Sequence, residues 1–516
     1  MKGRWIAWLA IAAAPFATSS PSHAQADTAR RAQALIAGLD CDEARKELAA
    51  ADPDDLAIAL ERARLAIYEL DCDGAAAILG RPELQRTDAG GQLADIARGC
   101  QRVTAALAKD TDAQLGIEVR WQDEHDRALA PLLFDTVAKA RQALTRDLGV
   151  DWPKPTRVVV VRDLLSLSAM TGLPYKSAQT TGTVAVAKWG RVTLLSPRAS
   201  HHGYSWRDTV AHELTHLAVT RASRDRAPLW LQEGVAKREE VRWREPGPFD
   251  DRPPADAIVQ QGRERGMTFP LDKLGPSIAM LPSADAATVA FAEVTSFVHF
   301  YVQSEGDGAL AKLLLELERG KEPNEALVAA SGLDLKAWDE KWAAHVTSLP
   351  REPGLSAVGL GNDRNEAENK WKDLRDRSRL AELLLARGHA IEALNELDRI
   401  PHAESDPATA DPSFRWLRAR ALEGAGRREE GEPLVADPSQ VASPYGPWWA
   451  VRGRWARLRG DEAAATPSFA EAVAADPLNV EAACETIEPS ALPDVAEKAR
   501  LCEAARAAAE PPYDEQ

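Results

Sequence analysis

The chain has 516 residues and a net charge of −16, because its 79 Asp and Glu outnumber its 63 Lys and Arg. This length exceeds one ordinary domain and suggests about three. The negative charge argues against nucleic acid or an anionic membrane surface as a partner, since both repel an acidic protein.

Residues 1–26 have the pattern of a signal peptide for export. Lys2 and Arg4 form a charged start, an apolar run follows over 5–16, and Ala24-Gln25-Ala26 is a small-x-small cleavage site. We therefore expect a mature chain from Asp27 that is periplasmic or secreted. An uncleaved anchor is the alternative. The apolar run is too short to span a membrane, and no other stretch is long enough, so we expect no membrane span after signal removal.

Five cysteines follow this signal: Cys41, Cys72, Cys100, Cys484 and Cys502. Export to an oxidising compartment permits disulfides, and the odd number leaves at least one thiol free or paired between molecules. Cys484 and Cys502 flank two prolines and lie near expected helix ends, so we predict a hairpin that joins them in a disulfide. The pairing of the other three stays open.

Residues 27–109 are rich in Ala, Leu and charged residues and are expected to form a helical repeat region. Asp40-Cys41-Asp42-Glu43-Ala44 is echoed 31 residues later by Asp71-Cys72-Asp73-Gly74-Ala75. A period of this size fits repeats of helix pairs, and coincidence in an Ala- and Asp-rich stretch is the alternative. Gly99-Cys100 is a candidate third copy of the same turn.

Residues 113–350 are expected to form a second domain, with a small sheet before a mostly helical part. The β-branched run 156–161 predicts a buried strand. We also predict a strand over 117–121, a hairpin of 183–187 and 191–195 around Lys188-Trp189-Gly190, and a loop over 246–254. Helices are predicted over 129–148, 291–303, 310–318 and 335–345.

His212-Glu213-Leu214-Thr215-His216 is the most informative motif in the chain. On a helix the two histidines, four residues apart, leave the same face and can bind one zinc ion. Glu213 beside them can take a proton from water. Ser205 and Asp208 are placed for a capping box at the start of this helix. The alternative is a helix with two ordinary polar residues.

A second helix is predicted after Pro228, and it carries Glu233 on an otherwise apolar stretch. A carboxylate there needs a partner, and a metal ion is a good one. Here the chain resembles the gluzincin metallopeptidases, more narrowly the peptidase MA-like proteins. The matching pieces are His-Glu-Leu-Thr-His at 212–216 and Trp-Leu-Gln-Glu-Gly at 230–234. The resemblance implies an α+β zincin-like catalytic domain over 113–350, in which His212, His216 and Glu233 bind one zinc ion per chain. The alternative for Glu233 is a local cap or ion pair.

Further candidates for the site surround these motifs. His201, His202 and Tyr204 precede the first helix, although a solvated loop is the alternative interpretation. His299 and Tyr301 are candidate donors for the oxyanion of a tetrahedral intermediate. In relatives a tyrosine often stands where this chain has Phe291, which cannot donate a hydrogen bond. Glu239 and Glu240 could support the zinc histidines, but a solvated helix end is the favoured interpretation.

The C-terminal part begins with a linker, predicted over 351–362. Residues 363–516 are then expected to form a tetratricopeptide-like helical region, since Gly388, Gly426 and Gly460 mark successive turns at offsets of 38 and 34. A generic helical bundle is the alternative. Four tryptophans are interpreted as packing between helices rather than a ligand cage: Trp416, Trp448, Trp449 and Trp455.

The leading hypothesis is therefore an exported zinc metallopeptidase that cleaves a peptide or protein substrate, with Glu213 as general base. Helical repeats on both sides would bind a protein partner or present substrate. The rival is a non-catalytic scaffold built on a zincin fold and helical repeats, which the missing tyrosine favours. A structural zinc site is a third interpretation, and the finding of only three protein ligands speaks against it.

Overall fold

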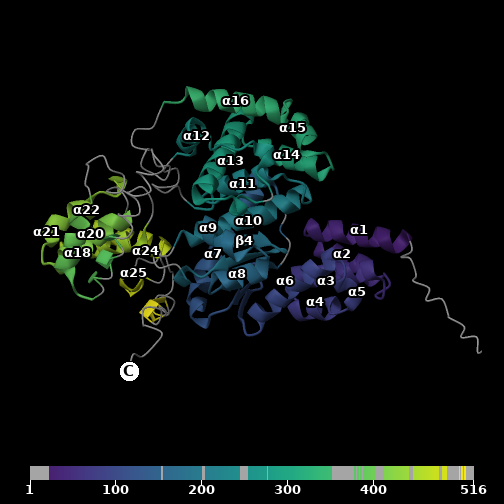
Figure 1. Cartoon of the computed structure of the whole chain (residues 1–516), viewed down its shortest axis with the longest axis horizontal. Helices are drawn as coiled ribbons and strands as arrows, with labels where there is room; N and C mark the ends of the chain where they lie inside the picture. Colours follow the sequence, from purple (N-terminus) through teal and green to yellow (C-terminus); the bar gives the residue numbers. More distant parts are fainter. Residues whose placement is uncertain are drawn as a thin grey trace, which may run out of the picture.

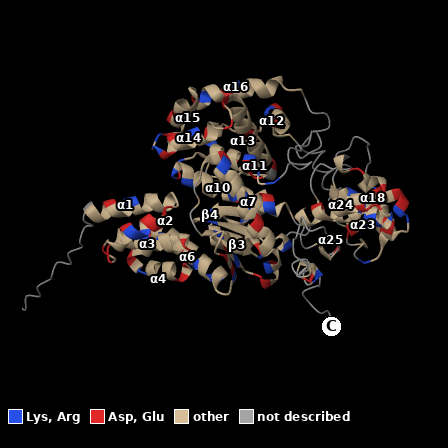
Figure 2. Cartoon of the chain, turned by 180° about the vertical axis from the view of Figure 1, so that it is seen from behind, with Lys and Arg blue, Asp and Glu red and all other residues tan. Residues whose placement is uncertain are grey.

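The computed structural model describes residues 23–150, 152, 155–199, 204–244, 254–275, 277–350 and most of 377–506. It is mostly helical with one small sheet, and the helices form three groups along the chain (Figure 1). Lys, Arg, Asp and Glu are interspersed over the helices of all three groups (Figure 2). No helix in the described part of the chain is both long enough and apolar enough to cross a membrane.

The five-stranded sheet lies at the centre of the molecule. Its strands are β1 (Ala108–Asp112), β2 (Ile117–Trp121), β3 (Thr156–Val161), β4 (Ala185–Lys188) and β5 (Arg191–Leu195), in the order β1-β2-β3-β5-β4. The three inner strands are parallel, while β1 and β4 run antiparallel at the two edges. Edge strand β4 is therefore left with one unpaired side, which matters for the site.

Both faces of the sheet are covered by helices, because the valines of β3 alternate between two cores. Val158 and Val160 pack with α7 (Ala130–Leu148) and α10 (Trp206–Ser223) on one face. Val159 and Val161 pack with α6 (Asp88–Thr104) and α8 (Leu164–Thr171) on the other. The β-branched run thus forms the doubly buried strand that the sequence predicts.

The helical part of this domain follows the sheet, as expected. It contains α11 (Leu229–Glu239), α12 (Ala255–Glu264), α13 (Ala284–Glu305), α14 (Ala309–Glu318), α15 (Pro323–Ser331) and α16 (Leu335–Ser348). Its core is aromatic: the ring of Phe297 lies 5.2 Å from that of Trp230 and 5.7 Å from that of Trp342, in both cases edge to face. The three later helices predicted from the sequence are confirmed, and α15 is an addition.

The N-terminal helices are α1 (His23–Ala37), α2 (Cys41–Ala49), α3 (Leu56–Tyr68), α4 (Cys72–Leu79), α5 (Pro82–Gln85) and α6. The repeated sequence at 40–44 and 71–75 also has a repeated structure. Leu39 and Leu70 both have positive φ, 62° and 64°, just before α2 and α4. The third copy proposed at Gly99-Cys100 is wrong, because both residues lie inside α6, where Cys100 forms a disulfide with Cys72. Residues 1–22 lie outside the described part, and cleavage after Ala26 stays a prediction.

The C-terminal helices are α18 (Ala390–Asp398), α20 (Pro412–Gly424), α21 (Arg428–Gly431), α22 (Pro433–Ala436), α23 (Gly446–Leu458), α24 (Glu462–Ala475) and α25 (Val480–Cys484). The three glycine turns are confirmed, each with a φ of +76° to +80°. Trp448, Trp449 and Trp455 are buried between helices, and the predicted disulfide joins Cys484 and Cys502. The linker over 351–362 lies outside the described residues.

Candidate metal centre

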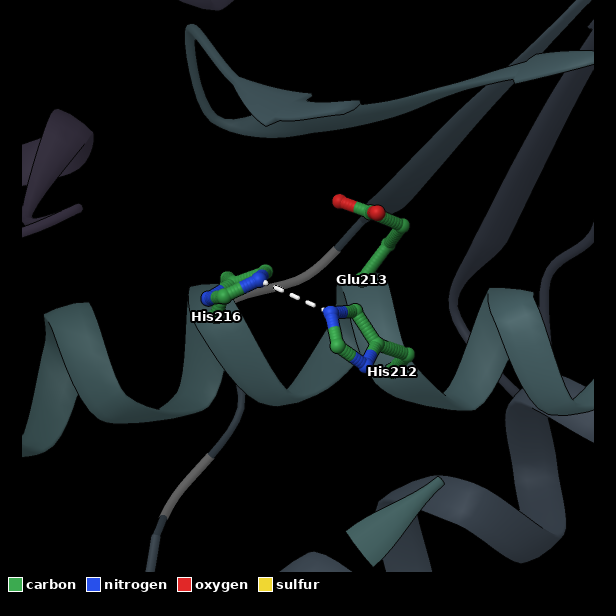
Figure 3. Close-up of side chains that lie close together, drawn as sticks. All are labelled: His212, Glu213 and His216. Carbon is green, nitrogen blue, oxygen red and sulfur yellow. Dashed lines mark hydrogen bonds between the residues drawn. The ribbon is translucent and has the colours of Figure 1, made fainter. Parts of the chain in front are cut away.

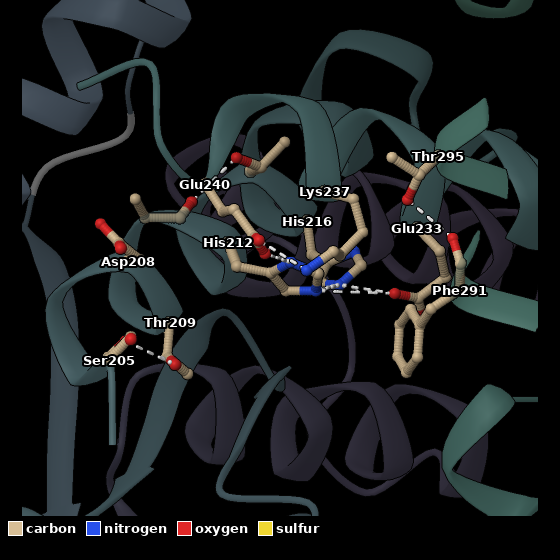
Figure 4. Close-up of polar contacts among 12 residues, drawn as sticks. Ser205, Asp208, Thr209, His212, His216, Glu233, Lys237, Glu240, Phe291 and Thr295 are labelled. Carbon is tan, nitrogen blue, oxygen red and sulfur yellow. Dashed lines mark hydrogen bonds and ion pairs between the residues drawn. The ribbon is translucent and has the colours of Figure 1, made fainter. Parts of the chain in front are cut away.

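The central feature of the site is a pair of imidazoles that face each other on α10. His212 Nε2 lies 3.2 Å from His216 Nε2 (Figure 3). Helix α11 packs across α10 and places Glu233 Oε2 3.6 Å from the first of these nitrogens and 3.5 Å from the second (Figure 4). Glu213 also belongs to the cluster, since its carboxylate and the two imidazoles present ligand atoms that lie within 4.8 Å of one another.

These distances fit a tetrahedral metal ion. Zinc binds imidazole nitrogen and carboxylate oxygen at about 2.0–2.1 Å, and tetrahedral angles then separate two ligand atoms by about 3.3–3.4 Å. The three separations between His212, His216 and Glu233 bracket this value. Two nitrogens and one oxygen, with a fourth position left for water, are the donor set of a catalytic zinc site.

The outer nitrogens of the two imidazoles each meet an acceptor. His212 Nδ1 lies 3.1 Å from Glu240 Oε2, and His216 Nδ1 lies 3.3 Å from Gln232 Oε1. If both Nδ1 atoms donate, both Nε2 atoms carry lone pairs that point at each other. Such an arrangement is repulsive unless a cation lies between them, so the outer contacts also prepare the inner nitrogens for a metal.

The charge of the site attracts cations. Burial alone would lower the pKa of His212, but its contacts with Glu233 and Glu240 outweigh burial and raise the pKa to about 10. Burial alone would raise the pKa of Glu233, yet the two histidines hold it well below its usual range. The carboxylates thus remain charged in the protein interior, where a metal ion can balance them.

Glu213 leaves α10 in a different direction from the histidines (Figure 3). It is 7% exposed, and burial raises the pKa of its carboxyl group. The carboxyl group contacts the backbone of Ala187 on edge strand β4. Glu213 therefore lies between the histidine pair and the unpaired edge of the sheet.

A cleft of about 1220 Å³ runs over this centre. One wall is formed by 181–188, which includes all of β4, and the floor by α10 and α11. The opposite wall is the face of α13 that carries Thr288, Phe291, Ala292, Thr295 and His299. The cleft is large enough for several residues of an extended peptide.

Of the other candidate site residues predicted from the sequence, some line the cleft and others do not. His299 lines the cleft, two helical turns beyond Phe291, whose ring lies 6.5 Å from that of His212. Tyr301 does not reach the cleft: it is 1% exposed and packs edge to face on Trp338. The hydroxyl of Tyr204 donates to the carbonyl of Leu195. His201 and His202 lie outside the described residues.

Two expectations about helix ends are wrong. Glu239 and Glu240 are not a solvated end: Glu239 is 2% exposed beside Arg238, and Glu240 contacts His212. The capping box also fails, because the side chain of Ser205 caps no backbone amide of α10. Asp208 binds Arg244 and Trp243 instead, so a tertiary ion pair replaces the local cap.

Gln232, Arg242 and Arg244 were not among the site residues predicted from the sequence. Gln232 stands next to Glu233 in the motif Trp-Leu-Gln-Glu-Gly, and this position is the one sequence signal for its contact with His216. The role of Glu240 depends on how α11 crosses α10, which the sequence does not specify.

Comparison with known families supports a zincin-like peptidase for the central part of the chain. The family model of the Peptidase MA superfamily matches residues 136–348, which include α10, α11 and α13. No curated protein and no solved structure gives a significant match to the chain. The family match therefore covers the metal centre and does not extend to the flanking helices.

Proposed function

We propose that this chain is an exported zinc metallopeptidase of the gluzincin type. Zinc would be held by His212, His216 and Glu233. The observation that carries the proposal is the set of separations among their three ligand atoms, 3.2 to 3.6 Å. The match to the Peptidase MA superfamily over 136–348 supports the same reaction class.

A zinc ion bound there would supply a water of lowered pKa and polarise the substrate carbonyl. The protein's own contribution is the proton transfer. Glu213 would accept the proton of the attacking water and then give it to the leaving amine. Its burial and raised pKa suit this role, because a base that must also act as an acid works best with a pKa nearer neutrality.

Edge strand β4 would hold the substrate. An extended peptide can pair with an unpaired sheet edge through main-chain hydrogen bonds, whatever its side chains. The contact between Glu213 and Ala187 places this edge next to the general base. A peptide paired with β4 would thus present a carbonyl between Glu213 and the histidine pair.

The flanking helices would serve binding rather than chemistry. We propose that the tetratricopeptide-like region 363–516 contacts a protein partner or presents substrate, since stacked helix pairs form concave surfaces. In the described part of these helices no cluster of His, Cys, Asp and Glu has metal-ligand geometry.

Metal analysis and peptide hydrolysis test the proposal together. Purified, dialysed protein should hold one zinc per chain, and His216→Ala should hold none, because two remaining ligands bind poorly. Wild type should cleave members of a broad library of quenched fluorescent peptides. His389→Ala is the matched control, since His389 precedes α18 outside the cleft. A folded wild type that holds zinc and cleaves nothing would instead favour the non-catalytic scaffold.

A further inference from the structure

A second cavity, of about 500 Å³ and rich in arginine, lies next to the cleft. Among the described residues its lining consists of Arg146, Arg238, Val241, Arg242, Arg244, His299, Val302 and Gln303. Arg238, Val241 and His299 line the metal-bearing cleft as well, so the two cavities are adjacent. The arginines come from the end of α7 and from the end of α11 with the turn after it, so segments distant in sequence converge there.

The nearby carboxylates balance these arginines only in part. Arg146 contacts Asp147 at 2.7 Å, and Arg242 contacts the same carboxylate at 2.8 Å. Arg238 is paired with Glu239. Arg244 is paired with Asp208. Four guanidinium groups thus share three carboxyl groups.

The unused donors of Arg242 and Arg238 point to an anionic ligand. Only Nε of Arg242 has an ion-pair contact, with Asp147 and more distantly with Glu239, which leaves its two terminal nitrogens for a ligand. Arg238 is 9% exposed, and only one of its nitrogens meets a carboxylate. A fork of guanidinium N–H groups is matched geometrically by a carboxylate, which accepts two parallel hydrogen bonds.

The distance from the histidine pair to the arginine cavity can be estimated along α13. Phe291 lies at the histidine pair, and His299 marks the opening of the second cavity on the same helix. Eight helical residues span about 12 Å. An extended peptide covers that distance in about three or four residues.

We propose that this arginine cavity binds a carboxylate of the substrate, three or four residues from the scissile bond. The carboxylate can come from an Asp or Glu side chain or from a free C-terminus. This inference rests on the proposed peptidase function and adds a substrate class to it, namely peptides with an acidic group at that distance.

Hydrolysis of matched peptides tests the proposal. In a neutral peptide that wild type cleaves, Asp is placed at each position in turn, with Asn as its uncharged partner and with free or amidated C-termini. We expect a KM lower by about tenfold or more when a carboxylate lies three or four residues from the cleaved bond, the size of effect of a charge-assisted contact. If amidation of the C-terminus abolishes the lower KM, the terminal carboxylate is the group that binds. If the lower KM persists after amidation, the Asp side chain is the group that binds.

Arginine variants locate the effect. Arg242→Gln and Arg146→Gln should remove the preference for the acidic peptide, so that its KM rises to that of the neutral peptide. Arg319→Gln is the control, because Arg319 is 59% exposed and pairs with Glu316 away from both cavities. KM values that change neither between Asp and Asn peptides nor on amidation of the C-terminus would overturn the proposal. So would a preference that survives both arginine variants.

A binding measurement separates this inference from the proposed function. Fluorescence anisotropy of labelled Asp and Asn peptides is measured on the full-length Glu213→Gln variant and on the same variant with Arg242→Gln added. Tighter binding of the Asp peptide that Arg242→Gln abolishes supports the arginine site, even if wild type cleaves no peptide. Affinities that change neither between Asp and Asn peptides nor between free and amidated C-termini overturn it, even if wild type is an active peptidase.

Discussion

The two glutamates beside the histidine pair have opposite electrostatic environments, and this separates their roles. Burial raises the pKa of Glu213, with the histidines opposing the effect. The pKa of Glu233 is also raised by burial, but contact with both imidazoles outweighs this and keeps the carboxylate charged. One group is suited to move a proton, and the other to balance a cation.

Glu213→Gln and Glu233→Gln should therefore fail in different ways. Glutamine at 213 keeps the size of the side chain but cannot take a proton, so we expect zinc to be retained and kcat to fall by about 10²–10⁴-fold. Glutamine at 233 removes a charged ligand, so zinc itself should be lost on dialysis. Zinc content and peptide hydrolysis are measured on both variants. A Glu213→Gln protein that cleaves at the wild-type rate would refute the mechanism.

Glu240 should control metal affinity without touching the metal. Its contact with His212 Nδ1, at 3.1 Å, fixes the ring and its tautomer. We expect Glu240→Ala to weaken zinc binding by about 10–100-fold, the usual effect of losing such a partner. Glu240→Gln keeps an accepting oxygen and should lose less. Competition with a chromophoric chelator gives both affinities, and equal affinity of Glu240→Ala and wild type would contradict the assignment.

Glu293 should make the stability of the helical part depend on pH. It is 2% exposed, its Oε2 accepts the backbone N–H of Phe269, and burial raises its pKa from 4.5 to about 7. An acid with a raised pKa binds its proton more tightly in the folded state. Its contribution to stability is therefore full below pH 4.5 and is lost as the pH rises through about 7.

Glu293→Gln keeps an oxygen for Phe269 and removes the titration. The variant should gain stability over wild type as the pH rises from 5 to 8, by an amount on the order of 3 kcal/mol at most. Thermal midpoints at several pH values give the difference. Glu340→Gln is the control, since Glu340 is 70% exposed on α16. A constant difference between Glu293→Gln and wild type across this range would show that Glu293 does not titrate there.

At the scale of elements, close packing joins the N-terminal helices to the catalytic domain. Arg191 on β5 is fully buried and donates to the carbonyls of Ile67, near the end of α3, and Met170, near the end of α8. Trp189, in the β4–β5 turn, lies edge to face on Tyr68 with 6.0 Å between ring centroids. The hairpin that forms the cleft wall is thus held from behind by N-terminal helices.

Gly99 permits the closest approach in this packing. A Cβ at this position of α6 would lie 2.2 Å from the carbonyl oxygen of Ala169 on α8. Gly99→Ala should destabilise the fold by about 1–3 kcal/mol, because backbone must move. Gly91→Ala is the matched control on the same helix, where the added methyl meets only an ordinary contact at 3.6 Å. It should stabilise by up to about 1 kcal/mol. Urea transition midpoints test the difference, and equal shifts for both variants would contradict it.

The sequence predicted those elements whose residues signal their own structure. Strand β3 is a β-branched run, β2 alternates apolar and charged residues, β5 is mostly apolar, and glycine marks the turns of the C-terminal helices. Strand β1 was missed because Ala108–Asp112 is polar and pairs only at the sheet edge. The motifs likewise indicated His212, His216 and Glu233, whereas Glu240 and the arginine cavity depend on how α7, α11 and α13 meet, which local patterns do not encode.

At the scale of the whole molecule, the two flanking helical regions differ in their attachment. Helices α18 to α25 pack chiefly against one another. Both regions share buried core with the central domain, but the N-terminal helices add ion pairs at the metal-bearing helix: α6 packs on α8, and Asp40 accepts from both Arg221 and Arg224 near the end of α10. The helix that carries His212 and His216 is therefore anchored to the N-terminal region.

Deletion of each region should consequently have opposite results. Without 363–516, we expect the protein to fold, to hold one zinc and to cleave a small generic peptide, because none of the described residues in this range lines the cleft or belongs to the metal cluster. Without 27–109, Arg191 loses the carbonyl of Ile67, Arg221 and Arg224 lose Asp40, and one face of the sheet is exposed. This second deletion should give insoluble or metal-free protein. Solubility, zinc content and hydrolysis are measured for both. If the first truncation folds but loses all hydrolysis of such a peptide, the C-terminal helices take part in the active site, and the division of roles between repeats and catalytic domain is wrong.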